Sequence, residues 1–243
     1  MGEELSAVKV VTVTGVSNRE FLETYARAGR VGLAGGATLV DLAIRRAERL
    51  LDEQRRWSRW SHAFVFQGAR ADGRHWVIES DLEIAPKHIR LGAQENRVDK
   101  FWDEKHCPNL AVLDFGLAET QLTAVLQAGL ELIASRAKYS MRELLGTLVG
   151  LRAPRLRGRA NLLARDRSMF CSALVHHLFQ QAGVDLAPGV DGKHTTPEDI
   201  ARSPAIQVAY LLVRTPEETK LARLRKTLRS RLPARLRRKN PPK

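Results

Sequence analysis

Cysteine is scarce in this sequence, which has only Cys107 and Cys171 and no Cys-x-x-Cys pair. That excludes a disulfide-dense scaffold and argues against a structural zinc site. Long apolar runs are also missing, since none approaches the roughly 20 residues that span a bilayer. The first residues, MGEELSAVKVV, are acidic where a secretory signal needs positive charge. We therefore expect a cytoplasmic protein, either free or peripherally membrane-associated, with no metal and no cofactor.

Positive charge is abundant but unevenly spread. Residues 215–243 carry nine of the thirteen net positive charges. In this tail Leu221, Leu224, Leu228, Leu232 and Leu236 recur every three or four residues among Arg and Lys, a basic amphipathic pattern that suits an anionic membrane surface. Pro233 interrupts the pattern, and a solvated tail explains the composition equally well. The tail has no aromatic side chains for base stacking, which argues against nucleic acid as a partner.

Apolar periodicity predicts a mixture of strands and helices without a βαβ rhythm, which indicates an α+β fold. The predicted strands cover residues 7–15, 61–68, 74–80, 110–116 and 206–213. The predicted helices cover residues 17–28, 37–55, 119–137, 139–151, 168–182 and a short segment from 195. Between them, residues 151–167 carry six Arg and are predicted to form a basic loop. The glycines of VGLAGGAT lack the Gly-Lys-Ser/Thr of a phosphate loop and predict a turn or a strand-edge bulge.

Cys171 is the candidate nucleophile, because a thiolate forms most readily where positive charge or aligned N–H groups surround it. We expect its helix to begin near Ser168, which puts Cys171 about one turn from the N-terminus. The alternative is a buried structural cysteine, since Leu174, Val175 and Leu178 share its helical face. The next residues, His176 and His177, point about 100° apart, so one is expected to pack and the other to face solvent.

His62 and Glu79 are the candidate base and its orienting carboxylate, on two strands joined by the turn segment Ala-Arg-Ala-Asp-Gly. One register pairs His62 with Glu79, and the other pairs it with Glu83. In both registers Glu79 lies on the same face as His62, because strand side chains alternate. A carboxylate beside an imidazole holds its tautomer and stabilises its charged form.

Five sequence blocks extend this interpretation. They are WSRWSHAFVFQG, WVIESDLEI, KYSMRELLG, MFCSALVHHLFQQAG and HTTPEDIARSP, in that order. Together they resemble the circularly permuted papain-like amidases, the YiiX-type branch of the NlpC-like cysteine peptidase superfamily, which is related in fold to lecithin:retinol acyltransferase. The resemblance covers residues 30–213. It departs from the family pattern at VGLAGGATLVD, where the family usually has a Gly-Asp strand.

The resemblance implies a permuted papain-like fold, with an antiparallel sheet or barrel packed against helices and the nucleophile at a helix N-terminus. It implies an N-terminal extension over residues 1–30, a catalytic domain over 31–214 and a basic tail over 215–243. The implied site residues are the catalytic Cys171, His62 and Glu79, the auxiliary or oxyanion residues Tyr139 and Ser172, and the substrate-binding residues Trp60 and Ser61. Trp60, like Trp57, is otherwise expected to pack in the core.

The expected activity is hydrolysis of an amide or ester, in a peptide or a lipid, through a thioester. Two alternatives stay open. One is acyl transfer or lipid hydrolysis at a membrane surface, and the other is a non-catalytic membrane- or nucleic-acid-binding module. The sequence does not define an oligomeric state.

Overall fold

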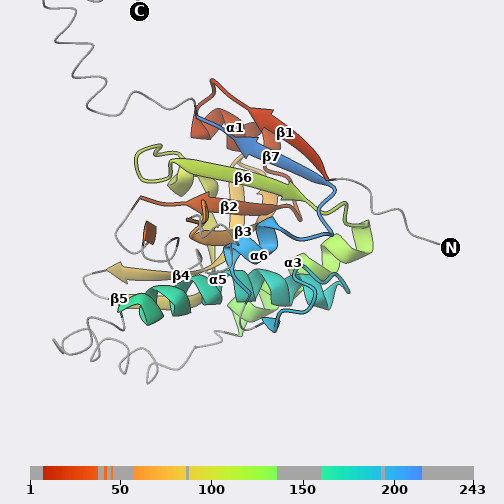
Figure 1. Ribbon diagram of the computed structural model, residues 1–243. Coiled ribbons are helices and arrows are strands. Elements are labelled where there is room, and N and C mark those ends of the chain that lie inside the picture. The colour runs from red at the N-terminus through yellow and green to blue at the C-terminus, as the bar shows by residue number, and fades with distance from the viewer. Residues whose placement is uncertain are drawn as a thin grey trace, which may run out of the picture. The chain divides into compact units, whose positions relative to one another are not determined.

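A mixed sheet in the order β1-β7-β6-β2-β3-β4-β5 forms the centre of the protein (Figure 1). The computed structural model describes residues 8–37, 41, 42, 45, 57–85, 88–135, 160–192 and 195–214. The strands are β1 (Lys9–Val13), β2 (Val31–Gly35), β3 (His62–Ala69), β4 (His75–Ala85), β5 (His88–Arg97), β6 (Asn109–Asp114) and β7 (Val208–Leu212). β1 runs parallel to β7, and every other neighbouring pair is antiparallel.

Helices cover both faces of this sheet. They are α1 (Asn18–Tyr25), the 3-10 helix η2 (Val98–Phe101), α3 (Glu119–Ala134), α5 (Ala160–Gln181) and α6 (Pro197–Ala201). The α+β prediction is confirmed. Of the predicted antiparallel sheet or barrel, an open sheet is observed, with β1 and β5 as its two edges. This sheet is mixed and not wholly antiparallel, because β1 pairs with β7 in parallel. None of the helices in the described part of the chain has the length and apolar character that a membrane span requires.

Two apolar cores lie on opposite faces of the sheet. Val65, Ile78 and Leu113 face α3 and α5, where they meet Val125 and Leu178. The opposite core holds side chains from α1, from η2 and from the strand residues that point to the other face of the sheet. Among them are Phe21, Leu22, Phe64, Phe66, Val77 and Phe101. The period-two alternation of β3 therefore sends His62, Phe64 and Phe66 toward the α1 side.

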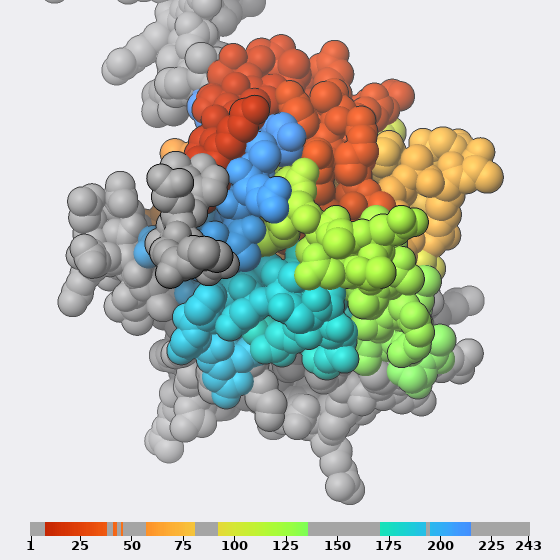
Figure 2. Space-filling view, turned by 90° about the vertical axis from the view of Figure 1, so that its right-hand side faces the viewer, coloured from red at the N-terminus to blue at the C-terminus, as the bar shows by residue number. Residues whose placement is uncertain are grey.

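Within the segment 1–30 that was predicted to be an extension, the described residues 8–30 contribute to the same sheet and core. β1 pairs with β7 from Lys9 opposite Val208 to Val13 opposite Leu212. Figure 2 shows these red N-terminal atoms directly against the blue atoms of the last described residues. α1 begins as predicted at Ser17, which forms a capping box with Glu20. The chain divides into two units, Met1–Val213 and Arg214–Lys243.

The predicted turn or bulge at VGLAGG is wrong, because this segment is β2, a buried strand between β6 and β3. Glycine is required there by close packing. A Cβ on Gly32 would lie 2.1 Å from the Phe64 ring, and one on Gly35 would lie 1.9 Å from the carbonyl oxygen of Arg59. The strand β5 was also missed, since its sequence HIRLGAQENR is too polar to show a strand pattern.

Several predictions fall outside the described residues. Four residues of the helix predicted for 37–55 are described: Ala37 is not helical, whereas Asp41, Leu42 and Arg45 are. The predicted helix at 139–151, including Tyr139, and the tail at 215–243 lie outside the described part altogether.

Candidate active site

His62 is the first residue of β3, and Glu79 lies within β4, the other strand of the hairpin. Nε2 of His62 is 2.5 Å from Oε2 of Glu79. The Glu79 side chain is 0% exposed and that of His62 is 18% exposed. Both predicted registers were two residues off. Val65 pairs with Ile78, and continuing this register puts Phe64 opposite Glu79.

The turn and a bulge together explain the difference in register, since Ala69 pairs with His75 next to the turn, which neither predicted register has. The pairing shifts by one residue between Phe66 and Gly68, and Gly68 takes a φ of 94°. Glycine adopts this left-handed conformation without the penalty that a Cβ imposes. The shift keeps His62 and Glu79 on one face, so the prediction that they share a face is confirmed.

Two further side chains hold the other oxygen of Glu79. Nδ2 of Asn96, on β5, donates to Oε1 at 2.7 Å. Nζ of Lys100, in η2, lies 2.5 Å from the same Oε1. A buried carboxylate is costly unless it is paired and hydrogen-bonded, and here one carboxylate meets an imidazole, an amide and an ammonium.

Cys171 completes the cluster from α5. Its side chain is 1% exposed and hydrogen-bonds to His62. Since Glu79 engages Nε2 of His62, Nδ1 is the ring nitrogen left for the sulfur. Burial lowers the pKa of His62, but the charge and hydrogen bonds of Cys171 and Glu79 more than offset it and raise the pKa from 6.5 to about 10. The imidazole is therefore protonated at neutral pH.

The prediction that Cys171 lies one turn from a helix N-terminus is wrong. α5 begins at Ala160, so Cys171 lies about three turns into it. The run from Ala160 through Leu163 and Ala164 to Arg165 consists mainly of strong helix formers, which extend the helix back into the predicted basic loop. The helix dipole acts only over the first turn, so the positive charge beside the sulfur comes from His62 instead.

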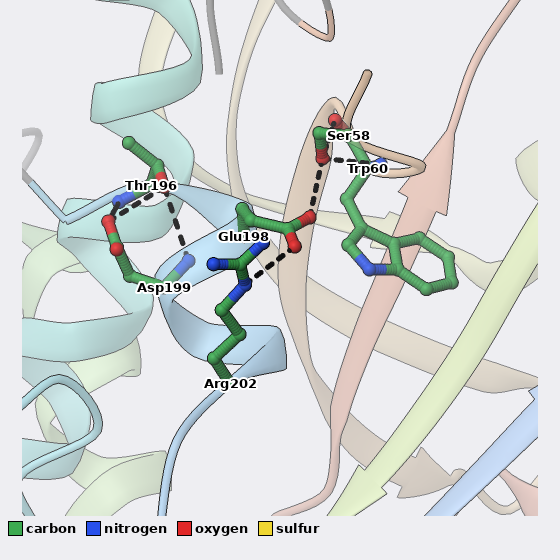
Figure 3. A network of polar contacts seen from close by, with 6 residues as sticks. All are labelled: Ser58, Trp60, Thr196, Glu198, Asp199 and Arg202. Carbon is green, nitrogen blue, oxygen red and sulfur yellow. Dashed lines mark hydrogen bonds and ion pairs between the residues drawn. The ribbon is translucent and has the colours of Figure 1, made fainter. Parts of the chain in front are cut away.

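A polar network fixes the segment that leads into His62 (Figure 3). Oγ of Ser58 accepts from the backbone N–H of Trp60 at 3.0 Å and donates to Oε2 of Glu198 at 2.8 Å. Glu198 lies on α6, where Nε of Arg202 binds its other oxygen at 2.9 Å. Two of the five sequence blocks, WSRWSH and TTPED, are thus in direct contact.

The helix α6 begins as predicted at the Thr-Pro-Glu-Asp segment. Thr196 is the N-cap, and its hydroxyl and backbone N–H both bind the carboxylate of Asp199. Pro197 occupies the first turn, where its missing N–H is not needed. This short, well-capped helix presents Glu198 to Ser58.

The remaining predicted site residues have structural contacts. The hydroxyl of Ser172 is buried and donates to the carbonyl oxygen of Thr195 at 2.7 Å. Ser61 accepts from the backbone N–H of Gly36 at 2.9 Å. Trp60 is 7% exposed and belongs to the core on the α5 side, whereas Trp57 is 48% exposed. Tyr139 lies outside the described residues.

The sequence did not single out Asn96 or Lys100. Asn96 lies on β5, where Glu79 pairs with Gln94 and Val77 with Asn96, which places Asn96 on the face of Glu79. Lys100 lies in η2, directly after β5. Among the described residues no group of three His, Cys, Asp or Glu side chains is arranged to hold a metal ion. Neither Cys107 nor Cys171 forms a disulfide.

The chain matches no protein-family model, and no curated protein is significantly similar to it.

Proposed function

We propose that this protein is a cysteine-dependent hydrolase of amides or esters, with a permuted papain-like fold, in which Cys171 is the nucleophile. One observation carries the proposal: the contacts run without a break from Cys171 through His62 to Glu79. Nucleophile, base and orienting carboxylate in hydrogen-bond contact are the arrangement that thiol hydrolases require. The order of the chain, with the base before the nucleophile, agrees with the permuted families that the sequence resembles.

The chemistry follows from the charges in the cluster. The Cys171 thiolate attacks the substrate carbonyl, and a C–S bond forms as the carbonyl oxygen takes up the negative charge. When the tetrahedral intermediate collapses, the C–N or C–O bond to the leaving group breaks and the leaving group takes a proton from Nδ1 of His62. His62, now neutral, then takes a proton from water, whose oxygen attacks the thioester. The second tetrahedral intermediate collapses as the C–S bond breaks, which releases the acid and restores the thiolate–imidazolium pair.

Thiol reactivity tests this proposal without knowledge of the substrate. The protein is treated with iodoacetamide from pH 4 to 9, and peptide mass spectrometry reads Cys171 and Cys107 separately. We expect Cys171 to react at pH 6 at least about tenfold faster than Cys107, which is also buried. Replacing His62 by Ala removes the positive charge beside the sulfur and is expected to abolish this advantage. Equal and slow reaction of both thiols in the wild-type protein contradicts the proposal.

Turnover is the second test. A panel of p-nitrophenyl esters and acyl anilides is expected to yield at least one substrate, whose hydrolysis stops in Cys171→Ala and continues in Cys107→Ala. Hydrolysis that survives in Cys171→Ala excludes this residue as the nucleophile.

The leucine-striped basic tail, residues 215–243, suggests a second possibility, in which the protein works at a membrane surface by acyl transfer or lipid hydrolysis. Such a tail suits work on lipids at an anionic surface. Flotation with phosphatidylserine vesicles, with and without residues 215–243, separates the two cases. Binding that depends on the tail favours acyl transfer or lipid hydrolysis, and absence of binding favours hydrolysis away from membranes.

A further inference from the structure

Lys100 contacts the candidate site through Glu79 and is not itself one of the three residues Cys171, His62 and Glu79. Its Nζ is 2.5 Å from Oε1 of Glu79, while Oε2 of the same carboxylate binds His62. Glu79 therefore bridges an ammonium and an imidazole from within the protein. The Lys100 side chain is 32% exposed, so the bridge connects the buried carboxylate to the surface.

The position of Lys100 is set by contacts on both sides of η2. Nδ2 of Asn18, a buried side chain of α1, donates to the carbonyl oxygens of Phe101 at 2.8 Å and Cys107 at 2.9 Å. The Phe101 ring stacks on Phe64 of β3, with centroids 4.3 Å apart and planes 9° from parallel. The neighbour of Lys100 is thus fixed to α1 and to the strand that carries His62.

We propose that Lys100 is a positioning residue of the Cys171 site that acts through Glu79. It keeps the carboxylate ionised at mildly acidic pH and fixes its orientation, so that Oε2 stays on His62. This inference rests on the proposed function, since it assigns a role within the same site.

The groups that face Glu79 include His62 from β3 and Lys100 from η2, with the uncharged Asn96 from β5 and, beyond His62, Cys171 from α5. Without the ammonium, burial favours the protonated, neutral form of the Glu79 carboxyl as the pH falls. A neutral Glu79 no longer stabilises the charge on His62, and less imidazolium means less thiolate.

The test is the pH profile of Cys171 alkylation by iodoacetamide, read by peptide mass spectrometry in the full chain. In Lys100→Met we expect the acidic limb to move to higher pH by about one unit, which lowers the rate at pH 5 by about tenfold. The rate at pH 8 stays within about threefold of the wild type. Lys100→Arg restores the positive charge and is expected to restore the wild-type limb. If Lys100 only packed against its neighbours, its loss would not shift the acidic limb of the Cys171 profile, and the charge of Arg would not restore that limb.

A matched control is Lys105→Met, which removes an exposed lysine of the same loop region. It is expected to leave the profile unchanged. In a Glu79→Gln background, Lys100→Met is expected to have no further effect on the rate, because its route through Glu79 is gone. If Lys100→Met does not fold, Lys100→Gln, which retains a hydrogen-bond donor but no charge, gives the same comparison.

Two results would overturn the inference: a wild-type limb in Lys100→Met or Lys100→Gln, or independent effects of Lys100 and Glu79 in the double variant. The failure of the proposed function has a different signature. In that case Cys171 is slow in the wild-type protein and does not respond to His62→Ala, whatever residue occupies position 100.

Discussion

Two histidines of this protein, the partly buried His62 and the buried His176, lie in opposite electrostatic surroundings. His62, on β3, contacts the thiol of Cys171 and a carboxylate that is itself wholly buried, and its pKa is raised to about 10. His176, on α5, is 1% exposed, and its pKa is lowered because burial disfavours its charged form. The nearest carboxylate, Asp185, is 3.8 Å from its Nε2 and 54% exposed.

The two sites differ in how their ring nitrogens are satisfied. Both nitrogens of His62 have partners that favour a cation. Nδ1 of His176 lies 3.3 Å from the hydroxyl of Thr195, and its Nε2 has no hydrogen-bond partner among the described residues. His177, next along the helix, is exposed, which confirms that one of the two adjacent histidines packs and the other faces solvent. Burial alone makes a histidine neutral, and only a buried counter-charge in contact keeps it protonated.

The largest expected effect comes from removing the negative charge of Glu79, which is the counter-charge of His62. Glu79→Gln leaves His62 and Lys100 without a carboxylate, and breaking a buried pair in this way costs about 3–5 kcal/mol. Urea denaturation at pH 7 measures the free energy of unfolding. The control is Glu95→Gln, which breaks the partly exposed contact with Arg70 and is expected to cost less than about 1 kcal/mol. Equal costs in the two variants would show that Glu79 does not hold a cationic His62.

The raised pKa of His62 predicts a loss of stability at alkaline pH. The folded protein binds the proton more tightly than the unfolded chain, so this stability is fully present below pH 6.5 and is lost as the pH rises through about 10. Between pH 7 and 10 the wild-type protein is expected to lose at least about 2 kcal/mol more free energy of unfolding than His62→Gln. If the free energy of unfolding changed equally with pH in the two proteins, the pKa of His62 would be near its ordinary value.

The lowered pKa of His176 predicts the reverse on the acidic side. Here the unfolded chain binds the proton more tightly, so stability is present above pH 6.5 and falls as the pH drops toward the lower folded pKa. His176→Leu is expected to flatten the decline in stability from pH 7 to 5, which thermal unfolding in that range measures. A decline as steep as that of the wild type would mean that His176 is charged in the folded protein.

The smallest expected effect comes from removing the Thr195 hydroxyl, which hydrogen-bonds to His176. Thr195→Val leaves Nδ1 without its hydroxyl partner inside the protein, at a cost of about 1–2 kcal/mol in the free energy of unfolding. Thr24→Val removes an exposed hydroxyl that donates to the carbonyl of Glu20 and serves as the control, with a cost below about 0.5 kcal/mol. A cost for Thr195→Val no larger than for the control would show that the Thr195 contact does not satisfy the buried ring.

The sequence predicted the parts of this arrangement that depend on local pattern. Period-two alternation placed His62 and Glu79 on one face, and the helices predicted from residues 17 and 195 start within two residues of α1 and α6. The register of the hairpin was not predictable in this way, because the bulge before Gly68 shifts the pairing by one residue.

What the sequence missed depends on contacts between distant segments. Lys100 and Glu79 are 21 positions apart and meet only because the polar β5 joins the sheet. The glycines of β2 indicated a turn because the ring that covers Gly32 belongs to Phe64, on another strand. The start of α5 was misplaced because arginines were interpreted as a loop, although Arg is a good helix former.

The charge state of the His62 ring decides whether a thiolate–imidazolium pair exists in this protein. Long-range ¹H–¹⁵N spectra of the labelled protein at pH 7.5 report whether each ring nitrogen carries a proton, with His62→Gln and His176→Leu providing the assignments. The account predicts a doubly protonated His62 and a neutral His176 in the same sample, with His62 becoming neutral in Glu79→Gln. A neutral His62 that titrates near pH 6.5 would contradict the thiolate–imidazolium pair and the proposed catalytic role of Cys171.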